Sequence, residues 1–208
     1  MSYADRADAG RRLAVALRDH DLPSDPVVIG LPRGGVVVAA EVARALSADL
    51  DIVVVRKVGA PHQTELAMGA VGEGGEVVRN ERVIDQLGID DWRFAQAVAL
   101  AQAEADRRAR SLRGDHPPIE VAGRTAIVVD DGIATGSTAR VACQVVRQRG
   151  ATRIVLAAPV APAEAERRFA DVADDVCFLQ TPRSFMAVGQ FYADFTQVSD
   201  REVGDLLG

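Results

Sequence analysis

The stretch from residue 125 to residue 139 constrains the fold of this chain more than any other. It opens with five residues, TAIVV, that are apolar or β-branched, a composition typical of a strand buried on both faces. Two carboxylates, Asp130 and Asp131, end this run, and a loop of glycines and hydroxyl residues follows. Apolar residues then recur at helical spacing until Gly150, a typical helix stop. The pattern therefore predicts a strand, an acidic pair, a small-residue loop and a helix.

The loop of this unit has the chemistry of an anion site beside a sugar site. Its glycines let the backbone approach a ligand closely, and a helix start presents free N–H groups with the positive end of the helix dipole. Thr135, Ser137 and Thr138 add hydroxyl donors. Asp130 and Asp131 can accept hydrogen bonds from sugar hydroxyls or hold a cation. An anion cradle next to paired acceptors suits a phosphorylated ribose.

Residues 128–138, VVDDGIATGST, resemble the phosphoribosyl pyrophosphate (PRPP) signature of the type I phosphoribosyltransferases. The resemblance implies that Asp130 and Asp131 hold the ribose and act in catalysis, while the loop grips the 5′-phosphate. The implied phosphate-binding residues are Ala134, Thr135, Gly136, Ser137 and Thr138. The alternative is an ordinary strand–turn–helix with a Ser/Thr cap, which needs neither the two acids nor the two glycines.

A second unit of the same type lies nearer the N-terminus. Residues 27–29 predict a short buried strand, and a helical pattern follows a turn that contains Arg33, Gly34 and Gly35. The guanidinium fork of Arg33 suits phosphate oxygens. The resemblance implies that this turn binds the pyrophosphate leaving group of PRPP. Taken alone, the turn is equally compatible with a plain strand-to-helix connection.

The apolar run at residues 51–55 predicts another strand, with Arg56 and Lys57 at its end. Ligands of open α/β sheets bind beyond the carboxyl ends of the strands, and cations there offset part of the charge of a pyrophosphate. The resemblance implies that one basic residue here contacts the leaving group, and we assign this catalytic and PRPP-binding role to Lys57. Two solvated surface charges are the alternative.

Residues 59–75 are rich in glycine and turn-like, which is typical of a mobile lid between regular elements. The resemblance also implies a mobile catalytic loop here that closes over the ribose and excludes water. His62 and Glu65 are titratable residues in its first half. Glu65 is the candidate proton donor or acceptor, although the sequence does not fix its position.

The remaining pattern predicts an α/β fold with a doubly wound, mostly parallel sheet flanked by helices. Helices are expected over residues 80–87 and from about residue 92 to residue 113, and further buried strands at residues 153–160 and 176–179. Cations are favourable at the C-terminus of a helix, so the arginines that close the long helix are expected to be solvated. These arginines are Arg107, Arg108, Arg110 and Arg113.

Residues 181–208 depart from this alternation and predict a small hood with a final helix at residues 200–207, appended to a core of residues 1–180. The segment resembles the part of the family that recognises the acceptor, and aromatic faces stack on planar bases. The candidate acceptor-binding residues are Phe185, Phe191 and Tyr192. The alternative is that these rings only cover the edge of the sheet.

The formal net charge of the 208 residues is −6, so no general basic surface for nucleic acid is expected. Cys143 and Cys177 fall in a predicted helix and a predicted strand, which indicates two buried thiols rather than a disulfide. The sequence shows no apolar segment typical of a secretory signal and no apolar run long enough to span a bilayer. It therefore predicts a soluble cytoplasmic protein without a membrane partner.

The resemblance implies a transferase that moves the phosphoribosyl group of PRPP to a nitrogenous acceptor, such as a nucleobase, and releases pyrophosphate. It also implies Mg²⁺, bound mainly through PRPP, and no protein ligand of the ion is assigned. In the branch that acts on 6-oxopurines, a third carboxylate precedes the Thr–Gly pair, whereas this chain has Ala134, so the acceptor stays open. The oligomeric state also stays open, with a homodimer as one option.

Two other functions compete with the transferase. A PRPP-sensing regulator or nucleic-acid-binding protein on the same fold is the main alternative, and the acidic composition counts against it. A dinucleotide-dependent oxidoreductase is disfavoured because no G-x-G-x-x-G follows a strand.

Overall fold

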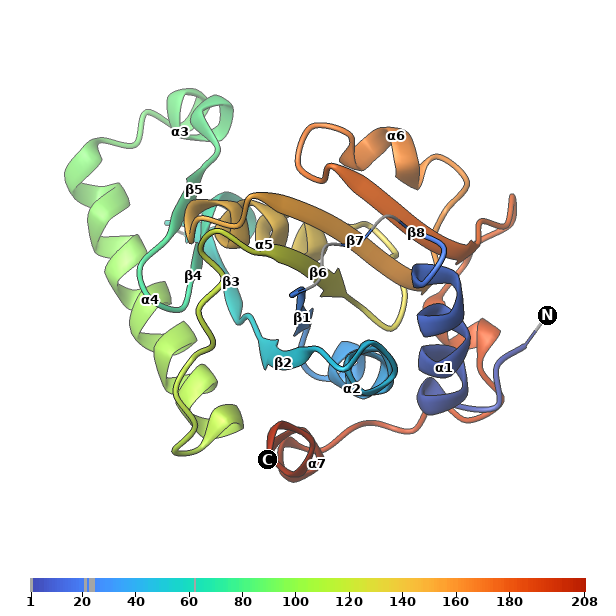
Figure 1. Ribbon diagram of the computed structural model, residues 1–208. Helices are drawn as coiled ribbons and strands as arrows, with labels where there is room; N and C mark the ends of the chain where they lie inside the picture. The colour runs from blue at the N-terminus through green and yellow to red at the C-terminus, as the bar shows by residue number, and fades with distance from the viewer. Residues whose placement is uncertain (1, 21, 23–24, 62) are drawn as a thin grey trace.

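A five-stranded parallel sheet with the order β2-β1-β6-β7-β8 forms the centre of the molecule (Figure 1). The computed structural model describes residues 2–20, 22, 25–61 and 63–208, and side chains within these ranges except those of residues 63–65. The strands are β1 (Val27–Gly30), β2 (Asp49–Ile52), β6 (Thr125–Val129), β7 (Arg153–Val160) and β8 (Asp175–Gln180). Every neighbouring pair is parallel, which confirms the predicted sheet.

Helices cover both faces of this sheet, as the predicted fold class requires. The helices are α1 (Arg6–Leu17) and α2 (Gly34–Leu46) on one face, and α5 (Ser137–Gln148) and α6 (Ala165–Phe169) on the other. Val28 and Ile127 pack in the same cluster as α1 and α2, whereas Ile29 and Val128 pack in the cluster of α5. Each central strand is therefore buried on both sides, which explains its near-continuous apolar sequence.

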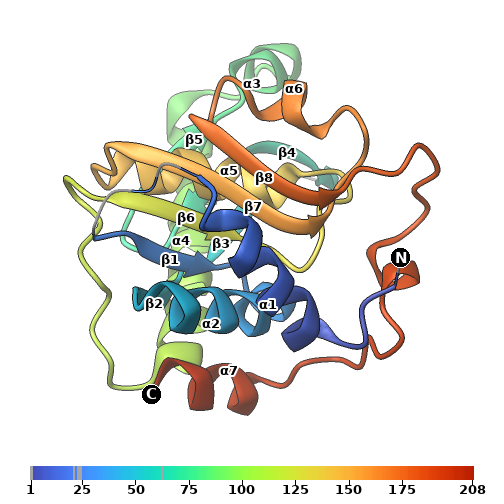
Figure 2. The same ribbon diagram turned by 45° about the vertical axis from the view of Figure 1, so that its right-hand side comes forward.

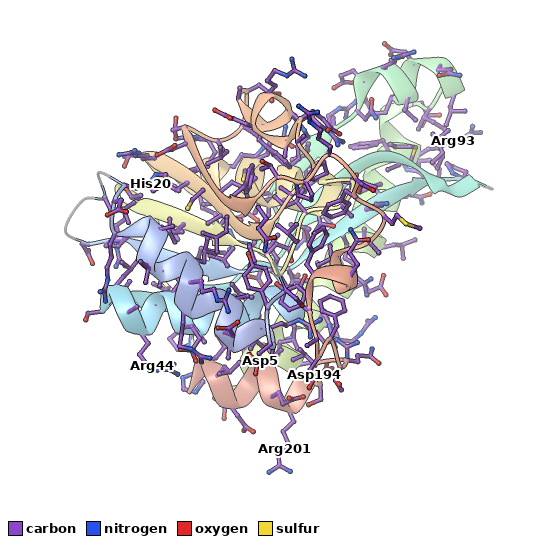
Figure 3. All side chains as sticks on the ribbon, turned by 90° about the vertical axis from the view of Figure 1, so that its right-hand side faces the viewer. Asp5, His20, Arg44, Arg93, Asp194 and Arg201 are labelled. Atoms are coloured by element: carbon purple, nitrogen blue, oxygen red, sulfur yellow. The ribbon has the colours of Figure 1, made fainter. Side chains whose placement is uncertain are left out.

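A second, antiparallel sheet of β3 (Val55–Ala60), β4 (Gln63–Gly72) and β5 (Val77–Arg79) was not predicted. It replaces most of the turn-like segment expected at residues 59–75. A Cβ added to Gly69 would lie 2.4 Å from the carbonyl oxygen of Val78, and one added to Gly72 would lie 2.6 Å from Val145 Cγ1. These glycines therefore permit close approach of neighbouring elements. Lid motion of residues 59–75 stays a prediction. These residues include the end of β3 and all of β4, and the β3–β4 hairpin projects at the upper right of Figure 3.

The strand expected at residues 51–55 is divided between the two sheets. β2 ends at Ile52 and β3 begins at Val55, so Arg56 and Lys57 lie inside an antiparallel strand rather than at the end of a parallel one. The two residues between these strands, Val53 and Val54, are buried. The chain therefore passes from the first sheet to the second within one unbroken apolar run, and the sequence gives no sign of this passage.

Helices α3 (Glu81–Leu87) and α4 (Asp91–Arg113) follow the second sheet, and their N-caps are Asn80 and Asp90. The last helix, α7 (Asp200–Leu207), packs against α2 and α4 (Figure 2). The expectation that the arginines near the end of α4 are all solvated is wrong, because the Arg113 side chain is only 7% exposed. Its guanidinium donates hydrogen bonds to Asp51 and Ile52 of β2 and to Glu73 after β4, distant contacts that sequence periodicity does not reveal.

The C-terminal segment returns to the N-terminus after β8. The amide N–H of Tyr3 donates to the carbonyl of Phe191 (2.8 Å), and the Asp194 N–H donates to the carbonyl of Ala4 (2.9 Å). Asp5 and Asp194 accordingly lie near one another in Figure 3. The segment also contains a short 3₁₀ helix, η1 (Val188–Phe191). The division between residues 1–180 and 181–208 stays a prediction.

Two smaller expectations concern the thiols and the membrane. Cys143 and Cys177 are free and buried, as predicted. In the described part of the chain, none of the helices has both the length and the apolar character that a membrane span requires.

Candidate functional site

Asp130 and Asp131 lie at the carboxyl end of β6, as the sequence predicted. The amide N–H of Asp130 donates to the carbonyl of Ala157 on β7 (3.2 Å), which holds the start of the loop to the sheet. The amide N–H of Asp131 donates to Asp130 Oδ1 (2.9 Å). Both residues are shielded from most of the solvent, and the Asp131 side chain is 15% exposed. The sheet thus fixes two adjacent carboxylates at the edge where open α/β folds bind ligands.

Arg6 completes this acid pair and was missed by the sequence reasoning. Its Nε donates to Asp131 Oδ2 (2.7 Å), and a terminal nitrogen donates to the carbonyl of Thr196 (2.8 Å). The guanidinium also lies 3.9 Å from the centre of the Phe195 ring. Arg6 is 9% exposed and stands in the first turn of α1, far from Asp131 in sequence. No local pattern signals such a pairing.

The two carboxylates differ in their electrostatic surroundings. Burial raises the pKa of Asp130 well above its ordinary value, and the charge of Asp131 raises it further. Burial also raises the pKa of Asp131, but the hydrogen bond from Arg6 opposes that rise. Asp131 is therefore the carboxylate that the fold keeps ionised more readily.

The turn between β1 and α2 packs directly on the acid pair. The amide N–H of Leu31 donates to the carbonyl of Val129 (2.9 Å). A Cβ added to Gly34 would lie 1.9 Å from Asp131 Oδ2, and one added to Gly35 would lie 2.7 Å from the Val129 carbonyl oxygen. Only glycine fits at these two positions, so the sequence-predicted turn and acids form one continuous surface. The peptide bond between Pro32 and Arg33 is cis.

The loop before α5 has the form expected for an anion site. Gly136 is the N-cap of α5 with a φ of +75°, and a Cβ there would lie 2.6 Å from Phe169 Cζ. Glycine is therefore required both by conformation and by space. The hydroxyls of Thr135 and Ser137 lie 3.3 Å apart. Most of the predicted phosphate-binding residues are exposed, namely Ala134, Thr135, Ser137 and Thr138.

Two cavities adjoin this loop on the side of the second sheet. One of about 340 Å³ brings Arg33 and Thr138 together with Arg56 and with Arg108 of α4. The other, of about 450 Å³, is lined by Lys57 together with Ser137 and Thr138. Lys57 thus lies beside the predicted anion loop, although it reaches it from β3. Arg108 was not among the sequence-predicted site residues, because the end of α4 was expected to be solvated.

The three aromatic candidates for acceptor binding have different surroundings. Phe185 lines a cavity of about 430 Å³ together with Ala134 and Thr135, and its ring centre is 5.5 Å from that of Phe191. Tyr192 is only 7% exposed, and its ring packs between those of Tyr3 and Phe195. The Tyr192 hydroxyl donates to the carbonyl of Asp131. Tyr192 therefore supports the backbone of the acid pair instead of offering a free face.

Two sequence-predicted residues fall where the structure gives no side-chain description. His62 lies outside the described residues, and Glu65 belongs to β4 while its side chain is outside them. The proton-transfer role of Glu65 stays a prediction. No cluster of three or more metal-binding side chains occurs among the described residues.

Known proteins are similar to this chain over nearly its whole length. The sequence model of the phosphoribosyl transferase domain matches residues 2–196. A protein of Mycobacterium tuberculosis strains CDC 1551 and H37Rv, named "Putative phosphoribosyl transferase", is 49% identical over 201 residues. These residues are 97% of this chain and 45% of that protein, so the chain spans less than half the length of this curated relative.

Solved structures show the same similarity. The crystal structure of TT1426 from Thermus thermophilus matches 100% of this chain and 98% of that chain, with a TM-score of 0.89 and 45% identity. The AQ2163 protein from Aquifex aeolicus matches 97% of this chain and 84% of that chain, with a TM-score of 0.51 and 11% identity. The second likeness shows the fold alone.

Proposed function

Because the chain belongs to the phosphoribosyl transferase domain family, we propose that it transfers the phosphoribosyl group of PRPP to a nitrogenous acceptor and releases pyrophosphate. The observation that carries this proposal is the contact between the β1–α2 turn and the acid pair. Gly34 and Gly35 pack on Asp130 and Asp131, so one ligand can touch both loops. PRPP has its ribose between a 5′-phosphate and a pyrophosphate, which matches the order of the binding groups.

Each part of PRPP has a partner in this arrangement. The 5′-phosphate fits the start of α5, where the N-cap Gly136 has no side chain to cover the first turn. The Ser137 N–H makes only a long hydrogen bond to Thr135 Oγ1 (3.5 Å). The ribose hydroxyls fit the oxygens of Asp130 and Asp131. The pyrophosphate fits the turn of Arg33, Gly34 and Gly35, and Lys57 approaches from the adjoining cavity.

The reaction breaks the bond between C1′ and the pyrophosphate oxygen and forms a bond between C1′ and an acceptor nitrogen, which loses its proton. The transition state carries positive charge on the ribose ring, as in glycoside transfer. A fixed carboxylate next to that ring stabilises the charge. Arg6 favours the ionised form of Asp131, so Asp131 supplies the negative charge. Asp130 then orients the ribose hydroxyls.

Mg²⁺ fits this site as an ion held mainly by the donor. The ion usually keeps several waters and takes one or two carboxylates together with phosphate oxygens of the substrate. Asp130 and Asp131 are the carboxylates that lie next to the proposed ribose position. When bound, Mg²⁺ neutralises part of the charge that develops on the leaving pyrophosphate.

A nucleobase is the acceptor class that the site favours. The cavity with Phe185 adjoins Ala134 and Thr135, and an aromatic wall suits a planar ring. Ala134 offers no carboxylate there, so the acceptor proton leaves through another group, for which Glu65 on the β3–β4 hairpin is the candidate. The hairpin is the element that would close over the ribose and exclude water.

The test is incubation of the protein with PRPP, Mg²⁺ and a panel of nucleobases, with release of pyrophosphate as the signal. Release with one base supports the transferase. Stabilisation by PRPP without release, together with retention on an RNA or DNA column, supports the regulator instead. If PRPP binds with a dissociation constant of about one micromolar, a PRPP concentration about 1,000 times higher raises the free energy of unfolding by about 4 kcal/mol. An unchanged melting temperature at that PRPP concentration contradicts both functions.

A further inference from the structure

Three arginines from three separate elements face one cavity beside the predicted pyrophosphate turn. Arg33 comes from the β1–α2 turn, Arg56 from β3 and Arg108 from α4, and Thr138 of the anion loop closes the cavity, which has a volume of about 340 Å³. The other lining residues are Pro32, Val53, Val54 and Val55. No lining residue is acidic, but carboxylates outside the lining pair with these arginines, and Glu104 lies 3.0 Å from Arg56.

The carboxylate that balances two of these arginines comes from the C-terminal helix. Arg108 donates two hydrogen bonds to Asp200, one to each carboxylate oxygen, and the bond to Oδ1 is 2.7 Å long. Arg33 lies 3.6 Å from the same Oδ1 atom. One carboxylate group at the first residue of α7 therefore holds both arginines.

This contact has the geometry of an exchangeable ion pair. The side chains of Arg108 and Asp200 are 30% and 40% exposed, so water and dissolved anions reach both. A paired fork of N–H donors fits two phosphate oxygens as well as it fits two carboxylate oxygens. An exposed pair of this kind contributes little to stability, so an incoming phosphate group can replace Asp200 at small cost.

We propose that Arg108 is a further binding residue for the pyrophosphate group, and that Asp200 holds Arg108 and Arg33 in place until that group replaces it. The inference rests on the proposed function. It adds Arg108 of α4 to the pyrophosphate site, and it makes the Asp200 carboxylate a competitor of pyrophosphate for Arg108. Arg108 binds the pyrophosphate before and after transfer, so it affects both donor affinity and product inhibition. Asp200 acts through the two arginines and is a positioning residue.

Two matched variants distinguish pyrophosphate binding by Arg108 from a purely structural role, in which the Arg108–Asp200 pair only holds α7 against α4. Arg108→Gln and Asp200→Asn remove the same ion pair, so a purely structural pair predicts the same result for both. The pyrophosphate site predicts opposite results. Arg108→Gln should weaken binding of PRPP with Mg²⁺ by about tenfold or more, the worth of a charge-assisted hydrogen bond. Asp200→Asn should strengthen it by about two- to fivefold, because the competing carboxylate is neutral.

Isothermal titration with PRPP, and separately with inorganic pyrophosphate, both in the presence of Mg²⁺, measures these affinities. Arg107→Gln is the control, since Arg107 is an exposed neighbour on α4 that lines neither site cavity. Its affinities should equal those of the wild type. Arg108→Lys keeps the charge but loses the fork, and an intermediate affinity is expected. It also replaces Arg108→Gln if that variant does not fold.

The outcomes distinguish this inference from the proposed function. If the wild type binds PRPP and the Arg108 variants bind it equally well, the role of Arg108 is wrong and the transferase proposal stands. If Arg108→Gln and Asp200→Asn weaken binding alike, the pair only tethers α7. If the wild type binds pyrophosphate through Arg108 but does not bind PRPP, the anion site is correct and the proposed function falls.

Discussion

Arg108 and Arg113 lie on the same helix, α4, but belong to two different kinds of arginine–carboxylate cluster. Arg113 is 7% exposed and pairs with Asp51 (2.8 Å) and Glu73 (2.7 Å), which are equally buried. Asp51 also accepts a hydrogen bond from the amide N–H of Ile119 (2.8 Å). Arg108 lines a cavity and pairs with the exposed carboxylate of Asp200. The Arg113 cluster joins α4 to β2 and to the turn after β4, and it stays buried although Arg113 and Glu73 also line a cavity of about 410 Å³. The Arg108 pair, in contrast, is exposed to water and dissolved anions.

The pair of Arg6 and Asp131 stands between these two clusters. Its side chains are 10% and 15% exposed, so it is nearly as buried as the Arg113 cluster, yet it touches the predicted ribose site. The three pairs form a series in which the cost of removing one partner rises with burial. A ligand can reach a pair only where its charged atoms are accessible. Replacement of one residue in each pair tests this series from the most buried pair to the most exposed.

Replacement of the buried arginine should have the largest effect. We expect Arg113→Ala to lower the free energy of unfolding by about 3–5 kcal/mol, because Asp51 would remain buried without its charged partner and Glu73 would be left with the longer contact to Arg149 (3.5 Å). Urea denaturation measures this loss. Arg110→Ala, an exposed change on the same helix, is the control and should stay within about 0.5 kcal/mol of the wild type. Equal losses in both variants would contradict the structural role of the Arg113 cluster.

Replacing the two acids one at a time should change the free energy of unfolding in opposite directions. Asp131→Asn leaves the buried Arg6 without its charged partner and should cost about 1–3 kcal/mol. Asp130→Asn removes a carboxylate whose pKa is raised by burial and by the charge of Asp131, and should stabilise the protein near neutral pH. Both variants should lose turnover. Denaturation midpoints and pyrophosphate release measure the two effects, and a stabilised Asp131→Asn would be inconsistent with the role of Arg6.

The pH dependence of stability sharpens the contrast between these two acids. Because the pKa of Asp130 is raised in the folded state, the folded protein binds more protons than the unfolded chain between the two pKa values. The free energy of unfolding therefore falls as the pH rises through that window. In Asp130→Asn this contribution to the fall should be absent. Denaturation midpoints of both proteins at a series of pH values check the prediction, which fails if the two curves stay parallel.

The exposed pair should give the smallest effect on stability. Asp200→Asn should cost about 0–1 kcal/mol, and less at high salt, which screens exposed charges. The hydrogen bond from Arg108 lowers the pKa of Asp200, so its contribution is present above the unfolded pKa and lost as the pH falls through the folded pKa. Melting temperatures at low and high salt measure the difference, whereas the loss in Arg113→Ala should be nearly independent of salt.

The sequence predicted the parallel sheet and the loop after β6 because their signals are local. An apolar run, two acids, glycines and a helical period lie within residues 125–150, and each element needs only its neighbours in the chain. Gly34 and Gly136 could likewise be identified, because close approach and positive φ require glycine. The packing of Gly34 and Gly35 on Asp131 and Asp130 is a finding of the structure, and it agrees with the rule that parallel strands end at one edge of the sheet.

The features that the sequence did not predict depend on distant contacts. The second sheet was hidden because the glycines of β4 serve close packing with β5 and α5, whereas glycine in a sequence more often indicates a loop. No local sequence pattern indicates the roles of Arg6 and Arg108, because their partners Asp131 and Asp200 belong to other elements. Residue type alone could not separate the solvated arginines of α4 from the buried Arg113.

We expect one PRPP molecule to span the loop after β6 and the turn after β1. A crystal structure of the complex with PRPP and Mg²⁺ would show this arrangement. We expect the 5′-phosphate against residues 134–138, the ribose hydroxyls on Asp130 and Asp131, and the pyrophosphate beside Arg33. Density for PRPP at another place on the molecule, with these two loops free of it, would rule out this binding mode.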